Sequence, residues 1–227
     1  MSDNQTQPQV LIVYEYLDSP RTLLHELSIN ESLYTEFTVR TFMRMVLEGV
    51  KYFHSKNVVH RNLRMENVLI CTAADGSRVV KLIGFEQAQL TEFTNLNGKA
   101  GTLLYTAPEV LDGKNYGSAV DIYALGIILH MIVSGTLAFE GKDPKIVTTK
   151  IKRSESQFKW KNWSKVTAEV KELVKSVLVS DARKRLKVSL SFLILFFFSL
   201  FLSFFLSFFL SLCLCLSLSL SRSLSYI

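Results

Sequence analysis

Residues 60–70 read His60-Arg61-Asn62-Leu63-Arg64-Met65-Glu66-Asn67-Val68-Leu69-Ile70, and this stretch decides the fold. Its last part, Val68-Leu69-Ile70, is an apolar run of the kind found in strands. Five further motifs follow it along the chain, and the order of the series is more specific than any single member. They are Lys81-Leu82-Ile83-Gly84-Phe85-Glu86, Gly101-Thr102, Ala107-Pro108-Glu109, Asp121-Ile122-Tyr123 with Gly126, and Asp181-Ala182-Arg183-Lys184-Arg185-Leu186.

The six segments resemble, in order, the motifs of the C-terminal lobe of a eukaryotic protein kinase. Residues 60–70 match the catalytic loop HRDLKxEN, residues 81–86 stand in the place of the DFG motif, and the last segment is similar to the DPxxRL run near the end of a kinase lobe. The resemblance covers residues 10–186. Within it, Phe158–Leu178 is similar to the calcium/calmodulin-dependent group.

The fold class that this resemblance implies is α+β: a protein-kinase-like fold with the mostly helical C-terminal lobe present and the small N-terminal lobe absent. No glycine-rich loop, phosphate-pairing lysine or helix glutamate precedes residue 10. We expect three regions, namely a disordered N-terminus at 1–9, the kinase-like lobe at 10–188, and a low-complexity tail of Phe, Leu and Ser at 189–227.

The hydrophobic pattern predicts the elements of the lobe. Between Phe37 and His54, apolar residues spaced four, four and three apart indicate an amphipathic helix. Val120–Val133 is apolar on nearly every side and indicates a helix buried within the domain, and the apolar stripe of Val166–Leu178 predicts another helix. Strands are expected at Val10–Leu17, Val58–Ile70 and Val79–Phe85, the last two on either side of a turn at Ala74–Ser77.

Two positions that phosphate transfer requires in protein kinases carry other residues here. Asn62 stands where the catalytic aspartate acts as the base, and a neutral amide takes up no proton near neutral pH, so a contribution of roughly 10²- to 10⁴-fold is lost. Gly84 stands where the DFG aspartate gives an anionic oxygen to magnesium. By resemblance, Asn67 remains as a metal ligand, and Arg64 replaces the lysine that contacts the transferred phosphate.

The resemblance also places the nucleotide-binding hinge at the start of the lobe. Tyr14 falls at the gatekeeper position, and the backbone from Glu15 to Leu17 is expected to meet adenine. Because the metal ligand is lost, no cofactor is expected, and ATP and magnesium enter only if residual binding persists.

The structural positions of the family are retained. His60 and Phe85 match members of the hydrophobic spine, and Asp121 matches the residue that hydrogen-bonds the backbone of the catalytic loop. Glu109 and Arg185 match an ion pair that ties the activation segment to the end of the lobe. Removing one partner of such a buried pair typically costs about 3 to 5 kcal/mol. These residues indicate the fold and do not bear on activity.

Arg61, within the catalytic loop, has two interpretations. As in phosphorylated kinases, it receives a phosphate from a threonine of the activation segment, with Thr91, Thr94 and Thr102 as candidates. The alternative is a solvated arginine that has no such partner.

The function that these residues predict is a catalytically inactive, kinase-like binding or scaffolding module. Its expected partners are other proteins, including kinases and signalling proteins. Two alternatives stay open: a weak or split serine/threonine kinase that transfers phosphate from ATP to protein, and a nonfunctional truncated gene product.

The composition of the chain limits the classes of partner and the cellular compartment that we expect. The net charge of +6 comes largely from lysines and arginines after Lys142, which indicate solvated helix faces, and no nucleic-acid partner is predicted. Cys71 is the single cysteine of the lobe, and Met1–Gln9 lacks the features of a secretory signal, so a cytoplasmic location is expected.

The tail has two explanations. Val188–Ser221 carries no charged side chain, exceeds the roughly 20 apolar positions that span a bilayer, and follows a basic flank, which predicts a membrane anchor with the lobe in the cytosol. However, pyrimidine-only codons encode just Phe, Leu, Ser and Pro, and Lys187-Val188-Ser189 is what an in-frame splice donor would encode. We therefore favour intron read-through, and a membrane partner is expected only if the tail is genuine.

Overall fold

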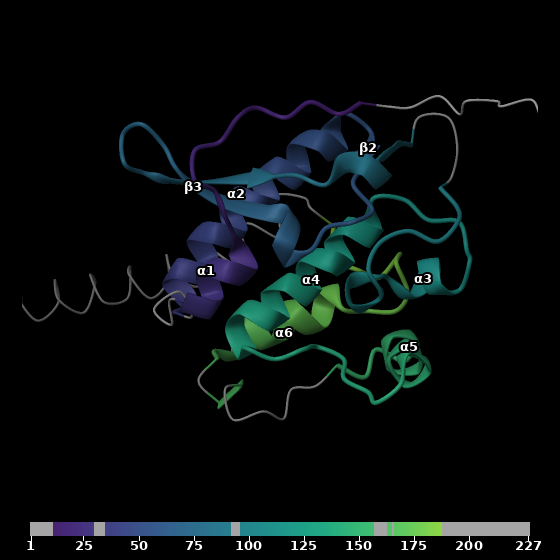
Figure 1. The fold of residues 1–227 in the computed structure, drawn as a ribbon. Coiled ribbons are helices and arrows are strands. Elements are labelled where there is room, and N and C mark those ends of the chain that lie inside the picture. The colour runs from purple at the N-terminus through teal and green to yellow at the C-terminus, as the bar shows by residue number, and fades with distance from the viewer. Residues whose placement is uncertain (1–10, 30–34, 92–95, 157–162, 165, 188–227) are drawn as a thin grey trace, which may run out of the picture.

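The structure, a computed structural model, describes residues 11–29, 35–91, 96–156, 163–164 and 166–187 (Figure 1). Its helices are α1 (Leu23–Ile29), α2 (Glu36–Ser55), α3 (Pro108–Leu111), α4 (Ala119–Ser134), α5 (Pro144–Lys152) and α6 (Ala168–Val177). Its strands are β1 (Arg21–Thr22), β2 (Val58–Val59), β3 (Val68–Thr72), β4 (Arg78–Leu82) and β5 (Gln89–Leu90). Single 3-10 turns form at η2 (Met65–Asn67), η3 (Phe85–Gln87) and η4 (Leu103–Tyr105). The predicted α+β class, mostly helical, is confirmed.

Helix α4 is the centre of the hydrophobic core. It is buried along nearly its whole length, and both α2 and α6 pack against it (Figure 1). The contact with α6 depends on Gly126, because a Cβ atom there would lie only 2.6 Å from Cγ1 of Val177 and 2.9 Å from Cδ2 of Leu178. The predicted buried helix at Val120–Val133 is thus confirmed, and its glycine allows close helix packing.

Helix α2 confirms the predicted amphipathic helix. The four periodic residues, Phe42, Val46, Val50 and Phe53, are all buried in the core. At the start of the helix the Thr35 hydroxyl accepts a hydrogen bond from the backbone N–H of Thr38 at 3.3 Å. This N-cap satisfies one of the amide groups that have no partner within the helix.

Two small antiparallel sheets lie beside the helices. Strand β3 is the middle strand of the sheet β1-β3-β4, and β2 pairs with β5 in the second sheet. The β3–β4 hairpin turns at Ala74–Gly76, as predicted, and the backbone N–H of Ala73 donates to Ser77 at 2.8 Å to close it. The catalytic-loop segment leaves β2, passes through η2 and enters β3, so residues 58–70 form two short strands separated by a loop and not one strand.

The predicted strand at Val10–Leu17 is wrong for the part that the structure describes. Residues 11–17 are not part of a strand, and within the described residues their backbone makes no hydrogen bond to other backbone groups. A strand is defined by pairing, and β1 already occupies the edge of β3. Likewise, the strand predicted at Val79–Phe85 ends at Leu82, and Phe85 begins the η3 turn.

Several predictions concern residues outside the described ranges. These are the disordered N-terminus at 1–9 and the tail at 189–227, with its membrane-anchor and read-through interpretations. Among the helices that the structure describes, none combines the length and the apolar character that crossing a bilayer requires.

Candidate functional site

The loop at residues 60–67 is anchored by the carboxylate of Asp121, at the start of α4. Its Oδ2 accepts from the backbone N–H of His60 at 2.9 Å, and its Oδ1 accepts from the backbone N–H of Arg61 at 2.9 Å. Arg61 has a left-handed backbone, φ 67°, so these bonds hold a conformation that a side-chain-bearing residue rarely adopts. The contact that the resemblance implied for Asp121 is therefore present. A residue that the sequence did not point to, His54 of α2, also reaches Oδ2 with its Nε2 at 2.8 Å.

His60 lies in an aromatic stack that joins the loop to the 84–86 segment. Its ring centroid is 4.5 Å from that of Phe85, and the ring of Phe53 lies 5.7 Å from Phe85. Because burial lowers the pKa of His60, the neutral ring is favoured. Its Nε2–H donates to the carbonyl of Ile83 at 2.9 Å, and its Nδ1 accepts from the backbone N–H of Asn62 at 3.3 Å. The predicted spine residues are thus in direct contact.

The side chain of Asn67 fills the space beside Gly84, the residue at the position predicted as the lost metal ligand. Gly84 has a left-handed backbone, φ 87°, and a Cβ atom there would lie 2.4 Å from Nδ2 and 2.6 Å from Cγ of Asn67. The same Nδ2 donates to the backbone carbonyl of Asn62 at 2.8 Å. The amide of Asn67 therefore fills the space beside Gly84 and is engaged with the loop.

These residues do not fit a magnesium ion. A hard cation prefers carboxylate oxygens, and the two positions supply one amide and no side chain. Among the described residues, no group of three or more His, Cys, Asp or Glu side chains is arranged to hold a metal ion.

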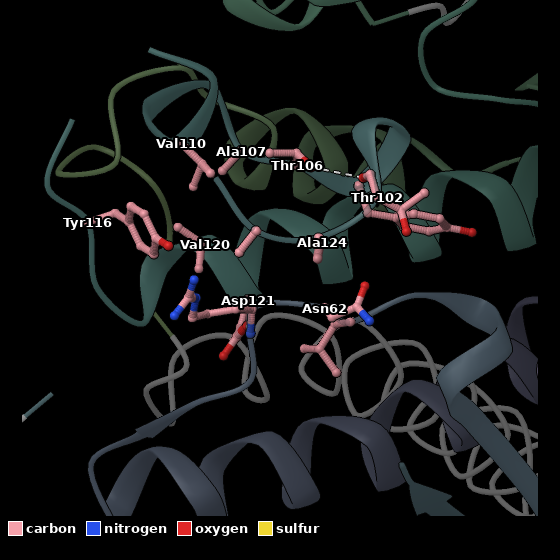
Figure 2. Close-up of a pocket in the computed structure, with 14 residues that line it drawn as sticks. Asn62, Thr102, Thr106, Ala107, Val110, Tyr116, Val120, Asp121 and Ala124 are labelled. Carbon is pink, nitrogen blue, oxygen red and sulfur yellow. Dashed lines mark hydrogen bonds between the residues drawn. The ribbon is translucent and has the colours of Figure 1, made fainter. Parts of the chain in front are cut away.

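Asn62 lies at the edge of a small pocket behind the loop (Figure 2). The pocket has about 20 Å³ of free volume, enough for roughly one water molecule. Its opposite wall includes Thr102 and Thr106, and the Thr106 hydroxyl donates to the Thr102 carbonyl at 2.9 Å. This cavity is too small for a nucleotide or a peptide side chain.

Arg64 faces the activation segment. Its Nη1 donates to the Thr102 hydroxyl at 3.0 Å, and its Nε lies 3.5 Å from Oε2 of Glu66. Burial, together with the nearby Glu66 carboxylate, raises the pKa of Tyr105 to about 12, so its hydroxyl stays protonated. Arg64, the predicted phosphate-contact residue, therefore contacts Thr102 and Glu66 of the same chain.

The hinge residues take part in contacts that the sequence did not predict. The Tyr14 hydroxyl accepts from the backbone N–H groups of Gly84 at 3.2 Å and Phe85 at 3.0 Å, and it lies 3.5 Å from Oε1 of Glu86. Glu86 occupies the place of the DFG glycine, so a carboxylate stands at this end of the site.

The two candidate adenine-contact residues face the β3–β4 hairpin. Oε1 of Glu15 is 2.6 Å from Nζ of Lys81 on β4. Leu17 lines an open groove of about 600 Å³ whose other walls include Met45 and Cys71. The structure therefore brings Glu15 and Leu17 together on one side of the lobe.

The predicted ion pair between Glu109 and Arg185 is present and bidentate. Nη1 and Nη2 of Arg185 donate to the two carboxylate oxygens at 2.7 and 3.0 Å, and the arginine side chain is 0% exposed. The guanidinium also donates to the carbonyls of Ala119 and Val179 and lies 4.9 Å from the ring centroid of Tyr123. Helix α3 is thereby joined to the end of the lobe.

The three candidate phosphate-accepting threonines differ in their surroundings. The Thr91 hydroxyl donates to the carbonyl of Asn57 at 3.1 Å, Thr102 contacts the Arg64 guanidinium, and Thr94 lies outside the described residues. Arg61 lies over the ring of Tyr116, 5.8 Å from its centroid, and lines a pocket with Gly101 and Lys99. Because the Tyr116 ring carries no charge, its contact with Arg61 agrees with both a phosphate-receiving arginine and a solvated one.

The anchored loop, the aromatic stack and the bidentate brace around a buried helix define a domain of the protein-kinase type. A sequence model described as the protein kinase domain matches residues 2–192, and the chain therefore belongs to the protein kinase family. The predicted resemblance to protein kinases is confirmed.

Three curated relatives illustrate the similarity. The chain is 36% identical over 165 residues to a probable serine/threonine-protein kinase 2 of Plasmodium falciparum, covering 73% of this chain and 32% of that protein. It is 28% identical over 192 residues to calcium-dependent protein kinase 5 of Plasmodium berghei, covering 80% and 34%. It is 31% identical over 188 residues to a probable myosin light chain kinase of Dictyostelium discoideum, covering 82% and 38%. The chain thus spans about a third of the length of these relatives.

Proposed function

We propose that this chain is a noncatalytic member of the protein kinase family that acts as a protein-binding or scaffolding module. The observation that carries the proposal is Gly84, which supplies no side chain where magnesium needs a carboxylate, while the Asn67 amide fills the space beside it. Phosphoryl transfer depends on positioning and on neutralising the charge of the phosphates. A site without a carboxylate at this position, and with the Glu86 carboxylate nearby, works against both requirements.

The base position supports the same proposal. Asn62 presents a neutral amide where the substrate hydroxyl needs a proton acceptor. In contrast, the bonds that Asp121 and Arg185 make to the rest of the lobe are retained. A domain that keeps its buried polar braces and lacks its reactive groups is suited to binding. The partners that we propose are other proteins, including kinases and signalling proteins.

The compartment that we propose for this module is the cytosol. Within the described residues, Cys71 is a buried free thiol, which a reducing compartment preserves.

A nucleotide-binding experiment tests the proposal. Binding of a fluorescent ATP analogue to the full-length chain in detergent micelles is measured with and without magnesium. We expect no magnesium-dependent binding. Tight binding that requires magnesium contradicts the proposal, and so does phosphate transfer from radiolabelled ATP to a peptide that disappears in the Asn62→Ala variant.

Back-substitution provides the matched comparison. The Asn62→Asp variant places a carboxylate at a half-buried position, whereas Gly84→Asp puts a side chain on a left-handed backbone and against the Asn67 amide. We expect Gly84→Asp to lower the free energy of unfolding by about 1 to 3 kcal/mol. We also expect the double variant to gain no magnesium-dependent binding. If it binds magnesium nucleotide tightly, then the space beside Gly84 is not limiting.

A weak or split serine/threonine kinase is the second candidate. It is favoured by Arg64, which keeps a positive charge at the predicted phosphate-contact position and donates to the Thr102 hydroxyl at 3.0 Å. The two candidates predict different results when a separately expressed kinase N-terminal lobe is added to the chain. The split-kinase candidate predicts that a peptide is then phosphorylated. The noncatalytic proposal expects none.

A further inference from the structure

Tyr14 ties the first described segment of the chain to the centre of the site. Its hydroxyl accepts two backbone hydrogen bonds, from consecutive residues Gly84 and Phe85, at 3.2 and 3.0 Å. Consecutive N–H groups at a turn that contains a left-handed residue can converge on one oxygen atom, and Gly84 is the left-handed residue here. The tyrosine oxygen fills this small concave donor site.

The rest of the segment is loosely held. The side chains of Leu11, Val13 and Tyr16 are 87%, 83% and 90% exposed. Within the described part of the chain, the backbone of residues 11–17 makes no bond to other backbone groups, and the polar side-chain contacts beyond Tyr14 reduce to the exposed pair of Glu15 and Lys81. An exposed ion pair contributes about 0 to 1 kcal/mol, so Tyr14 provides the main polar tie.

The surroundings of this tie make it sensitive to charge. Oε1 of Glu86 lies 3.5 Å from the Tyr14 hydroxyl, which also accepts from the two amide donors. A phosphate on that oxygen would bring about −1.5 to −2 charges next to the carboxylate, and its bulk would displace the oxygen from the two N–H groups. The charge repulsion and the loss of the two hydrogen bonds would both weaken the attachment of Tyr14 to residues 84–86.

We propose that Tyr14 is a modification site and that its hydroxyl acts as a latch, which phosphorylation by a tyrosine-directed kinase opens, releasing residues 11–17 from the Gly84–Glu86 segment. In this reaction the γ-phosphoryl group of ATP forms a new P–O bond to the tyrosine oxygen. The phenolic proton passes to the base of the modifying kinase, and ADP leaves. The residue is 40% exposed, so part of its surface is accessible to the modifying enzyme. This inference goes beyond the proposed function, because it holds whether or not the chain transfers phosphate itself.

Amide hydrogen exchange of the full-length chain in detergent micelles tests the latch. The chain is treated with a purified tyrosine kinase catalytic domain and ATP, the modified tyrosines are mapped by mass spectrometry, and exchange is followed in a peptide that contains residues 84 and 85. Loss of both hydrogen bonds should speed exchange there by about fivefold or more. Peptides from α4 serve as the internal reference for global unfolding.

Two variants separate the latch from its neighbours. Tyr14→Phe should reproduce the faster exchange without kinase and should not respond to kinase. Tyr16→Phe, which alters an exposed tyrosine on the same segment, should keep the slow exchange until Tyr14 is phosphorylated. The proposal is overturned if Tyr14 takes up no phosphate while Tyr16 does, or if phosphorylated Tyr14 leaves exchange at residues 84 and 85 unchanged. Neither result bears on magnesium-dependent nucleotide binding, which tests the proposed function separately.

Discussion

Replacing Arg185 by methionine removes the brace between α3 and the end of the lobe. The guanidinium donates to both carboxylate oxygens of Glu109 and to the carbonyls of Ala119 and Val179. Methionine keeps much of the volume and supplies none of these donors, so a carboxylate that is 8% exposed loses its partner. Removing one partner of a buried pair costs about 3 to 5 kcal/mol, and we expect a loss in this range.

Urea unfolding of the full-length chain in detergent micelles, followed by the fluorescence of the buried Trp163, measures this loss. The matched control is Arg183→Met, because that arginine side chain is 91% exposed and pairs with Asp181 at the surface. We expect the control to change the free energy of unfolding by less than about 1 kcal/mol. In Arg185→Met combined with Glu109→Leu, part of the stability should return, since no charge is then buried alone. Equal losses in the two single variants would refute the reasoning.

Three further predictions concern packing, pH and phosphorylation. Gly126→Ala should lower the free energy of unfolding by about 1 to 3 kcal/mol, because its methyl group would lie 2.6 Å from a valine of α6. The control is Gly117→Ala, whose methyl group meets no atom within 4 Å and so lacks this packing penalty. Urea unfolding measures the free energy of unfolding of both variants. Burial holds the pKa of His60 below 6.5, so the unfolded chain binds more protons and stability falls as the pH drops below 6.5. His60→Gln should flatten this dependence between pH 7 and 5 in unfolding titrations, and an unchanged slope would assign it to other groups. Phosphorylating Thr102, whose hydroxyl lies 3.0 Å from Nη1 of Arg64, should raise the melting temperature, because arginines of the catalytic loop would then pair with the phosphate. An unchanged melting temperature would argue against Arg61 as a phosphate-receiving residue.

The helical core was predictable because its signal is local. The spacing of Phe42, Val46 and Val50 marks one face of α2, and the unbroken apolar run of α4 marks a helix buried on all sides. By contrast, the strand expected at Val10–Leu17 did not form in the described residues, because a β-branched run indicates the capacity to pair and not the presence of a partner.

The candidate site was predictable in its positions and less so in its contacts. Ordered motifs placed Asp121 and Gly84, since each occupies a fixed place in a family pattern. They did not indicate that His54 would reach the Asp121 carboxylate or that Tyr14 would bind the backbone at Gly84, because these pairs are separated by 67 and 70 residues. The overlap between Asn67 and a Cβ atom at Gly84 is likewise a property of packing, which a linear pattern does not encode.

The closure beside Gly84 also bears on how substitutions at this site combine. Because the Asn67 amide fills the space beside Gly84 and holds the loop through Asn62, a carboxylate introduced alone would meet that side chain. A carboxylate at residue 84 would therefore require the Asn67 side chain to move, so the effects of substitutions at these two contacting positions are coupled and not independent.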